Sequence, residues 1–184
     1  MERLKSRYSI IGLSDGLFIG LGLSVGVSFF SSYNFTLAAT LLGGLTSALS
    51  NFFSTYNAET FATAERLQEY KHLLFLKEYQ PKKLIKERNA RSINYSFITF
   101  GFTLIGSVFV LIPYILASIY EVNSLQTAAV ASFILSLIGL GVMGGYNSES
   151  SGKALRGALK TIGTGILISA LSAAVGILLT TFLI

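Results

Sequence analysis

The sequence predicts an all-α integral membrane protein that crosses the bilayer five times. The chain of 184 residues is 52% hydrophobic and only 12% charged, whereas charged residues make up about a quarter of a typical soluble domain. Its mean hydropathy is +0.63. The few charges are gathered into short stretches between apolar runs that are each long enough to span a membrane. These observations indicate a multi-pass membrane protein.

Five apolar segments define the expected helices, and nothing in the sequence marks a second domain within residues 1–184. Polar breaks separate neighbouring segments of about the length that a helix needs to cross a bilayer. The expected spans are about 10–31, 35–56, 92–120, 125–146 and 155–184. Residues 57–91 are expected to form a short cytosolic helix, ended by Pro81, and then a basic connector. Pro113 is expected to kink the third span, because proline lacks a backbone donor.

The placement of the basic residues predicts the orientation. Three of the 14 Lys and Arg precede the first span, eight lie between the second and third, and three lie between the fourth and fifth. All of them fall on one side, and the positive-inside rule makes that side cytosolic. We therefore expect a cytosolic N-terminus and an external C-terminus. The same placement accounts for the net charge of +5 without nucleic acid, because these residues can lie beside anionic lipids.

Residue types exclude several kinds of site. The chain has no cysteine and one histidine, His72, so clusters of thiolates or imidazoles around a metal cannot be built. No glycine-rich loop is followed by Lys and Ser or Thr with P-loop spacing. An oxygen-rich site for a hard or borderline divalent cation remains. We predict no enzymatic activity and no permanently bound cofactor.

The first span carries a carboxylate within an apolar run. Asp15 falls on the same helix face as Gly22 and Gly26, at about 100° per residue. A carboxylate at membrane depth costs about 2.5–3.5 kcal/mol and normally faces a partner, a cavity or an ion, so Asp15 is a candidate for an ion path. The alternative is that it only caps a helix start inside the interface. Gly22 and Gly26 would let another backbone approach closely, as between two first helices of a dimer.

Polar residues of the second span repeat every four positions. Ser47, Asn51 and Thr55 form one stripe, which Glu59 continues a turn later. Together with Asp15, the residues Asn51, Thr55 and Glu59 would make an all-oxygen path for a divalent ion. The alternative is ordinary hydrogen bonding between helices, worth about 0.6 kcal/mol per contact.

The expected cytosolic helix carries Glu65 and Glu69 at i and i+4, with His72 one turn further on. A carboxylate-rich helix there could attract divalent cations before they enter the membrane. A solvated amphipathic helix with mixed charges is the simpler interpretation of these residues.

The first span resembles the first helix of the vacuolar iron transporter family, in SDGLFIGLGLSVG at residues 14–26. Similar stretches follow at residues 43–50, 105–114 and 157–179. The resemblance covers most of the chain and agrees with five spans and a cytosolic N-terminus. It implies a homodimeric carrier that moves Fe²⁺ or Mn²⁺ out of the cytosol, against protons, along a dimer axis lined by the first helices.

The family's ligands carry over only in part. Asp15 matches the family's first-helix aspartate, whereas Asn51 and Thr55 stand where methionine and glutamate are expected. The alternatives are a non-transporting membrane scaffold or regulator that keeps the fold, and a cation channel. The membrane would be the plasma membrane in a prokaryote and a vacuole-type membrane in a eukaryote.

Overall fold

The computed structural model consists of five helices: α1 (Glu2–Ser28), α2 (Tyr33–Leu73), α3 (Pro81–Ile119), α4 (Leu125–Tyr146) and α5 (Ser151–Leu183). It describes residues 2–29, 32–73, 81–120, 125–146 and 151–183, and the side chains of residues 6–29, 32–62, 89–120, 125–146 and 153–182. Within these residues there is no strand, which confirms the all-α prediction.

Each helix is long and apolar enough to cross a membrane. The candidate spans are Ser6–Ser28, Tyr33–Ala62, Asn89–Ile119, Leu125–Tyr146 and Lys153–Phe182. Large apolar side chains cover the outer surface, with Leu42 64% and Leu167 60% exposed. Such a surface is stable in lipid, because lipid tails are as apolar as leucine. The chain is therefore a multi-pass membrane protein, as predicted.

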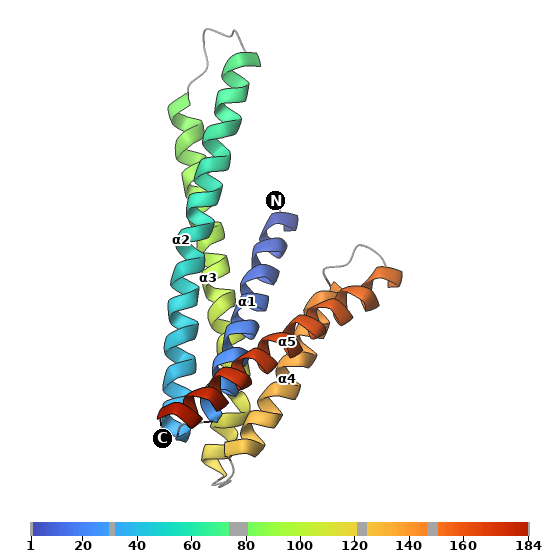
Figure 1. Ribbon diagram of the computed structural model, residues 1–184. Coiled ribbons are helices and arrows are strands. Elements are labelled where there is room, and N and C mark those ends of the chain that lie inside the picture. Colours follow the sequence, from blue (N-terminus) through green and yellow to red (C-terminus); the bar gives the residue numbers. More distant parts are fainter. Residues whose placement is uncertain (1, 30–31, 74–80, 121–124, 147–150, 184) are drawn as a thin grey trace.

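α1 lies between two helix pairs. α2 and α3 run side by side and extend beyond the other helices, and α4 and α5 form a second hairpin that tilts away from them (Figure 1). α1 contacts all four helices, and α3 most extensively. The helix ends next to the basic segments lie at the upper end in Figure 1, where α1 starts, α2 ends, α3 starts and α4 meets α5. That this end faces the cytosol stays a prediction.

The two long helices extend and correct the predicted boundaries. α2 continues without a break from the second span to Leu73, which confirms a helical extension. Residues 81–91, predicted to be a basic connector, instead form the first turns of α3. Pro81 is the first residue of α3, where its fixed φ and missing N–H suit a helix start, and the Lys, Leu, Glu and Arg residues after it favour helix. α3 continues through Pro113, and a kink there stays a prediction.

Small hydroxyl side chains occupy much of the buried interior. The buried polar residues are Ser24, Thr36, Thr40, Ser92, Ser96, Thr99, Thr103, Ser107, Ser132, Ser136 and Ser169. On α3 they repeat every three or four residues, and those from Ser96 to Ser107 donate to the carbonyl one turn earlier, as Ser96 Oγ does to Ser92 O at 2.8 Å. This internal pairing satisfies hydroxyl groups that have no access to water.

The backbones of α1 and α3 are in direct contact. A Cβ at Gly16 would overlap the carbonyl oxygen of Thr103, and a Cβ at Gly12 would lie 2.5 Å from Thr99 O. Ser107 Oγ also donates to Gly16 O at 3.4 Å. Contacts between small residues are typical of membrane helix pairs. They set the register of α1 against the hydroxyl-bearing face of α3.

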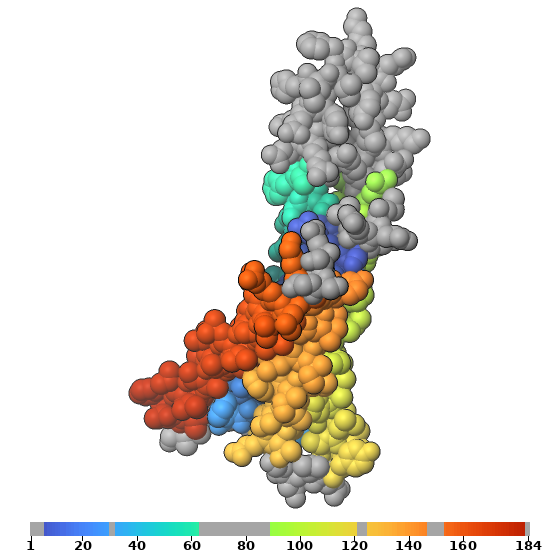
Figure 2. Space-filling view, turned by 90° about the vertical axis from the view of Figure 1, so that its right-hand side faces the viewer, coloured from blue at the N-terminus to red at the C-terminus, as the bar shows by residue number. Residues whose placement is uncertain are grey.

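Apolar packing joins α1 to α3 and α4. Leu17, Leu21, Val110 and Leu140 form a buried cluster, with Met143 packed at its edge. Met143 therefore fills a gap in the core, a common role for methionine. On the outer side, α5 lies across α4 (Figure 2), and its C-terminal part packs on the end of α1, where Thr180 Oγ1 donates to Phe29 O at 3.3 Å.

Candidate functional site

Asp15 lies in the interior of the first span. Its helix begins at Glu2 and the candidate span at Ser6, so the alternative in which Asp15 caps the start of a helix is wrong. The side chain is partly buried. Among the described side chains, no basic group lies against it. An ionised carboxylate at this depth depends on hydrogen-bond donors or on a cation.

Asn51 is the hydrogen-bond donor to this carboxylate. Its Nδ2 donates to Asp15 Oδ2 at 3.1 Å and to Thr103 Oγ1 at 3.1 Å. The hydroxyl of Thr103 in turn donates to Thr99 O at 2.8 Å. Side chains from α1, α2 and α3 therefore meet in one polar contact. Asp15 and Asn51 lie together as the sequence indicates, and their role in transport stays a prediction.

The two other predicted path residues lie further along α2. Thr55 is one turn and Glu59 two turns from Asn51, which places Glu59 about 12 Å away along the helix axis. Glu59 accepts a hydrogen bond from the hydroxyl of Tyr8 on α1. The ring of Tyr8 stacks on Tyr95 of α3, with ring centroids 5.1 Å apart. Of the four expected path residues, Asp15 and Asn51 thus share one contact, Glu59 belongs to a second, and Thr55 is part of neither. Residues four and eight positions apart share a helix face, but they also lie one and two turns apart along the axis.

For the helix expected to attract cations, the structure describes the backbone only. Glu65, Glu69 and His72 fall in the last turns of α2, and their side chains lie outside the described residues. Within the side chains that are described, no three acidic or histidine residues come together as a metal cluster. A role for these three residues in attracting cations stays a prediction.

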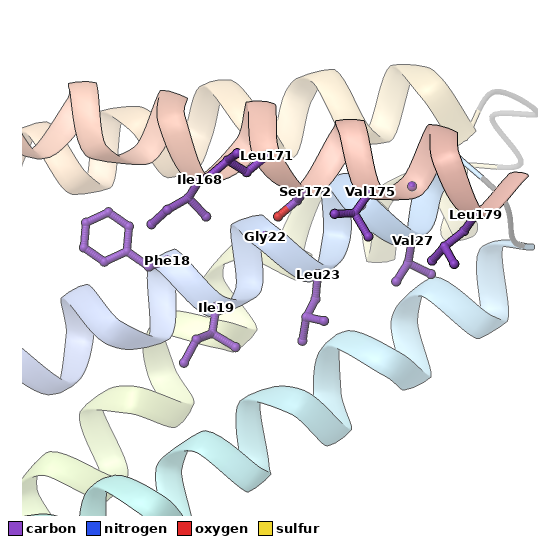
Figure 3. A pocket seen from close by; sticks show the side chains of 12 residues that line it. Phe18, Ile19, Gly22, Leu23, Val27, Ile168, Leu171, Ser172, Val175 and Leu179 are labelled. Carbon is purple, nitrogen blue, oxygen red and sulfur yellow. The ribbon is translucent and has the colours of Figure 1, made fainter. Parts of the chain in front are cut away.

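The face of α1 that carries Gly22 and Gly26 packs against α5 of the same chain. A Cβ at Gly26 would lie 3.1 Å from Ser172 O, and a Cβ at Gly22 would lie 3.2 Å from Ser172 Oγ. These glycines therefore have the predicted packing role, but the helix next to them is α5 rather than a second copy of α1. Beside this contact, α1 and α5 line an apolar groove of about 600 Å³, with Ser172 as its polar group (Figure 3).

Three residues of these contacts were not predicted: Thr103, Tyr8 and Tyr95. A signal for Thr103 exists in the sequence, because Thr99, Thr103 and Ser107 repeat every four residues, as Asn51 and its stripe do on α2. Nothing in the sequence pattern links Tyr8 to Glu59, which follows 51 residues later.

Comparison with known proteins identifies the family. A family model described as the VIT family matches residues 56–177, about two thirds of the chain. An uncharacterized protein from the archaeon Methanocaldococcus jannaschii is 30% identical over 148 residues, which are 79% of this chain and 76% of that protein. The family match covers the end of α2, all of α3 and α4, and most of α5, so Asp15 and Asn51 precede it. The chain belongs to the VIT family, the vacuolar iron transporter family that its first span resembles.

Proposed function

We propose that the chain moves the divalent ions Fe²⁺ or Mn²⁺ out of the cytosol in exchange for protons, and that Asp15 binds the two kinds of ion in turn. Membership of the VIT family points to metal-ion transport across a membrane. The observation that supports the role of Asp15 is its place inside a membrane span, bonded to Asn51 and with no described basic side chain against it. A membrane carboxylate without a fixed counter-ion is open to a cation.

A single carboxylate can couple the movement of a metal ion to that of a proton when it binds only one of the two at a time. A carboxylate must be deprotonated to bind a metal, and metal binding releases the proton. Occupancy of Asp15 by a proton and by a metal ion are therefore alternatives, which is the minimal requirement for exchange. Oxygen ligands suit Mn²⁺ better than softer ions such as Cu⁺.

The proposal includes a homodimer. Within the described part of one chain no group of three acidic or histidine side chains forms, whereas divalent ions take several oxygen ligands. Two copies that meet along α1 would bring two Asp15 carboxylates toward one axis. Ile11 lies one turn before Asp15 and is 40% exposed, so this part of α1 is accessible to a second copy.

A cysteine cross-link tests the dimer, because the natural chain contains no cysteine. We expect Ile11→Cys to form a disulfide-linked dimer in membranes under mild oxidation. Ile138→Cys on α4 is the matched control, since Ile138 is also an exposed isoleucine, at 58%, on a helix away from the proposed axis. Equal cross-linking of both variants, or of neither, would contradict a dimer along α1.

Flux into proteoliposomes tests transport. The purified chain is reconstituted with a metal-sensitive dye inside the vesicles, and Mn²⁺ or Fe²⁺ uptake is followed with and without a pH gradient. We expect flux that depends on the gradient and is lost in Asp15→Asn, which keeps the shape of the side chain and removes its charge. Glu121→Gln, the same carboxylate-to-amide change in the connection before α4, is expected to keep wild-type flux. Wild-type flux from monodisperse Asp15→Asn would remove Asp15 from the path.

One observation favours a second candidate, a non-transporting membrane scaffold. Among the described side chains, the contact between Asp15 and Asn51 contains one carboxylate, that of Asp15. Asn51 turns its amide nitrogen toward this carboxylate. No flux above that of empty vesicles would favour the scaffold. Flux that ignores the pH gradient would instead indicate a cation channel.

A further inference from the structure

Thr103 occupies the position that determines how Asn51 faces Asp15. The Thr103 side chain is fully buried, and its hydroxyl hydrogen is donated to Thr99 O at 2.8 Å. A hydroxyl has one hydrogen to donate, so Thr103 Oγ1 can only accept from Asn51. The amide of Asn51 has two hydrogens on Nδ2, and they bond Asp15 and Thr103, each at 3.1 Å. The amide oxygen, Oδ1, takes part in neither of these two bonds.

The opposite orientation of the amide is unfavourable at this position. With the amide turned over and the Thr103 hydrogen kept on Thr99 O, Oδ1 would face both the carboxylate of Asp15 and the lone pairs of Thr103 Oγ1, which are all acceptors. Donation from Thr103 to Oδ1 would instead break the bond to Thr99 O. The backbone contact at Gly16 holds Thr103 against α1, so Thr103 cannot easily withdraw. The acceptor on α3 therefore selects the orientation in which nitrogen faces Asp15.

We propose that Thr103 is a positioning residue for the cation site: it accepts from Asn51 and so keeps the amide nitrogen, not the amide oxygen, toward Asp15. This inference rests on the proposed function. Asn51 then competes with a cation for Asp15 Oδ2, because an N–H group cannot ligate a metal ion. For Asn51 to serve as the predicted oxygen ligand, the amide must turn over and break its bond to Thr103. Thr103 thereby weakens cation binding and favours release.

Direct Mn²⁺ binding to the purified full chain tests this role. The Kd is measured from the electron paramagnetic resonance signal of free Mn²⁺. In Thr103→Val the amide is free to turn, and we expect the Kd to fall by about 2- to 10-fold, as for the loss of one hydrogen bond that opposes binding. Thr103→Ser keeps the hydroxyl and is expected to keep the wild-type Kd. An unchanged or higher Kd in monodisperse Thr103→Val would overturn the proposal.

Thr40→Val is the matched control for removal of a buried hydroxyl. Thr40 is as fully buried as Thr103 and lies on α2 about three turns from Asn51. The same chemical change there is expected to leave the Kd unchanged, and a fall equal to that of Thr103→Val would count against a specific role for Thr103. If Thr103→Val is not monodisperse, Thr103→Ala removes the same hydroxyl with less volume in the core.

A second measurement needs no metal and separates this inference from the proposed function. In protein labelled with ¹⁵N-asparagine, the side-chain NH₂ signal of Asn51 is assigned by its loss in Asn51→Ala. We expect this signal to exchange slowly with water in wild type and in Thr103→Ser, and to shift and exchange faster in Thr103→Val. An unchanged signal in Thr103→Val would overturn the positioning role. If wild type binds no Mn²⁺, the proposed function fails, and this signal still decides whether Thr103 orients Asn51.

Discussion

The two sides of α1 use the same residue type to make different interfaces. Toward α3, Gly12 and Gly16 meet backbone carbonyls, and on the same side Asn51 donates to Asp15. Toward α5, a Cβ at Gly22 would first meet a side-chain oxygen at 3.2 Å, beside an apolar groove of about 600 Å³. One turn further on, the backbones do meet, because a Cβ at Gly176 of α5 would overlap the carbonyl oxygen of Gly26. The α3 side of α1 is thus closed and polar at Gly12 and Gly16, whereas the α5 side is open and apolar at Gly22 and closed only at Gly26.

The difference comes from the helix that faces the glycines. α3 presents small hydroxyl residues whose own hydrogen bonds are satisfied internally, so its backbone can touch α1. α5 lines the groove with Ile168, Leu171 and Val175, whose branched side chains are bulkier than the hydroxyl residues of α3. Glycine in one helix permits close contact, and the partner helix decides where that contact is made: α5 makes it at its own Gly176, next to Gly26. The following variants test this comparison.

Gly16→Leu is expected to have the largest effect. The side chain would have to displace the backbone of α3 at Thr103, and overpacking of this kind costs about 1–3 kcal/mol or more. We expect loss of the monodisperse peak in size-exclusion chromatography. Gly163→Leu on α5 is the matched control, because nothing lies within 4 Å of a Cβ at Gly163. If both variants elute and melt alike, the closed contact between α1 and α3 is wrong.

Tyr8→Phe is expected to have an intermediate effect on the closed side. It removes the donor to Glu59 and leaves the aromatic ring that stacks on Tyr95. A hydrogen bond to a charged group contributes about 1.5–3 kcal/mol, so the melting temperature in detergent should fall by a few degrees. Tyr95→Phe keeps the stacked pair without touching the bond to Glu59. An equal fall in both variants would show that the Tyr8 hydroxyl contributes nothing specific.

Gly22→Leu is expected to have a smaller effect on the open side. The nearest atoms to its Cβ are the Ser172 hydroxyl at 3.2 Å and a methyl group of Ile168 at 3.4 Å. The hydroxyl can rotate away, and the rest of the leucine side chain can enter the groove. We expect a loss below about 1 kcal/mol, and a monodisperse peak, since the backbone need not move. A loss as large as that of Gly16→Leu would mean that the two sides of α1 are equally closed.

Thr40→Val is expected to have the smallest effect, in the opposite direction. Among the described side chains, the Thr40 hydroxyl is buried without a hydrogen-bond partner. Replacing an unpaired buried hydroxyl by a methyl group of similar size removes a desolvation penalty, so stability should stay equal or rise by about 1 kcal/mol. A clear fall in melting temperature would reveal a partner for this hydroxyl that matters for packing.

Much of the fold could be predicted, because the length and composition of a membrane helix are local properties. The fourth span has the predicted bounds, Leu125–Tyr146. The start of α3 could not be predicted in the same way, because a run rich in Lys and Arg is read as a loop when only hydropathy is considered. Pro81 was the signal for the start of α3, because proline favours the first position of a helix as well as the end of the preceding helix.

The candidate site could be predicted only where one helix carries the pattern. The stripe that contains Asn51 indicated the face of α2 that meets Asp15. The acceptor Thr103 and the donor Tyr8 depend on the register between helices, which the backbone contact of α1 with α3 sets. No spacing within a single segment reports that register.

The uninterrupted course of α2 and α3 has a mechanical consequence. Neither α2 from Asn51 to Leu73 nor α3 from residue 82 to residue 100 contains glycine or proline, the residues at which helices usually bend sharply. The part of this pair that extends beyond the other helices (Figure 1) is therefore a stiff continuation of α2 as far as Asn51, and of α3 as far as residue 100, after which Gly101 precedes Thr103. We expect a force applied at the far end of this pair to be transmitted along α2 to Asn51, which donates to the carboxylate of Asp15.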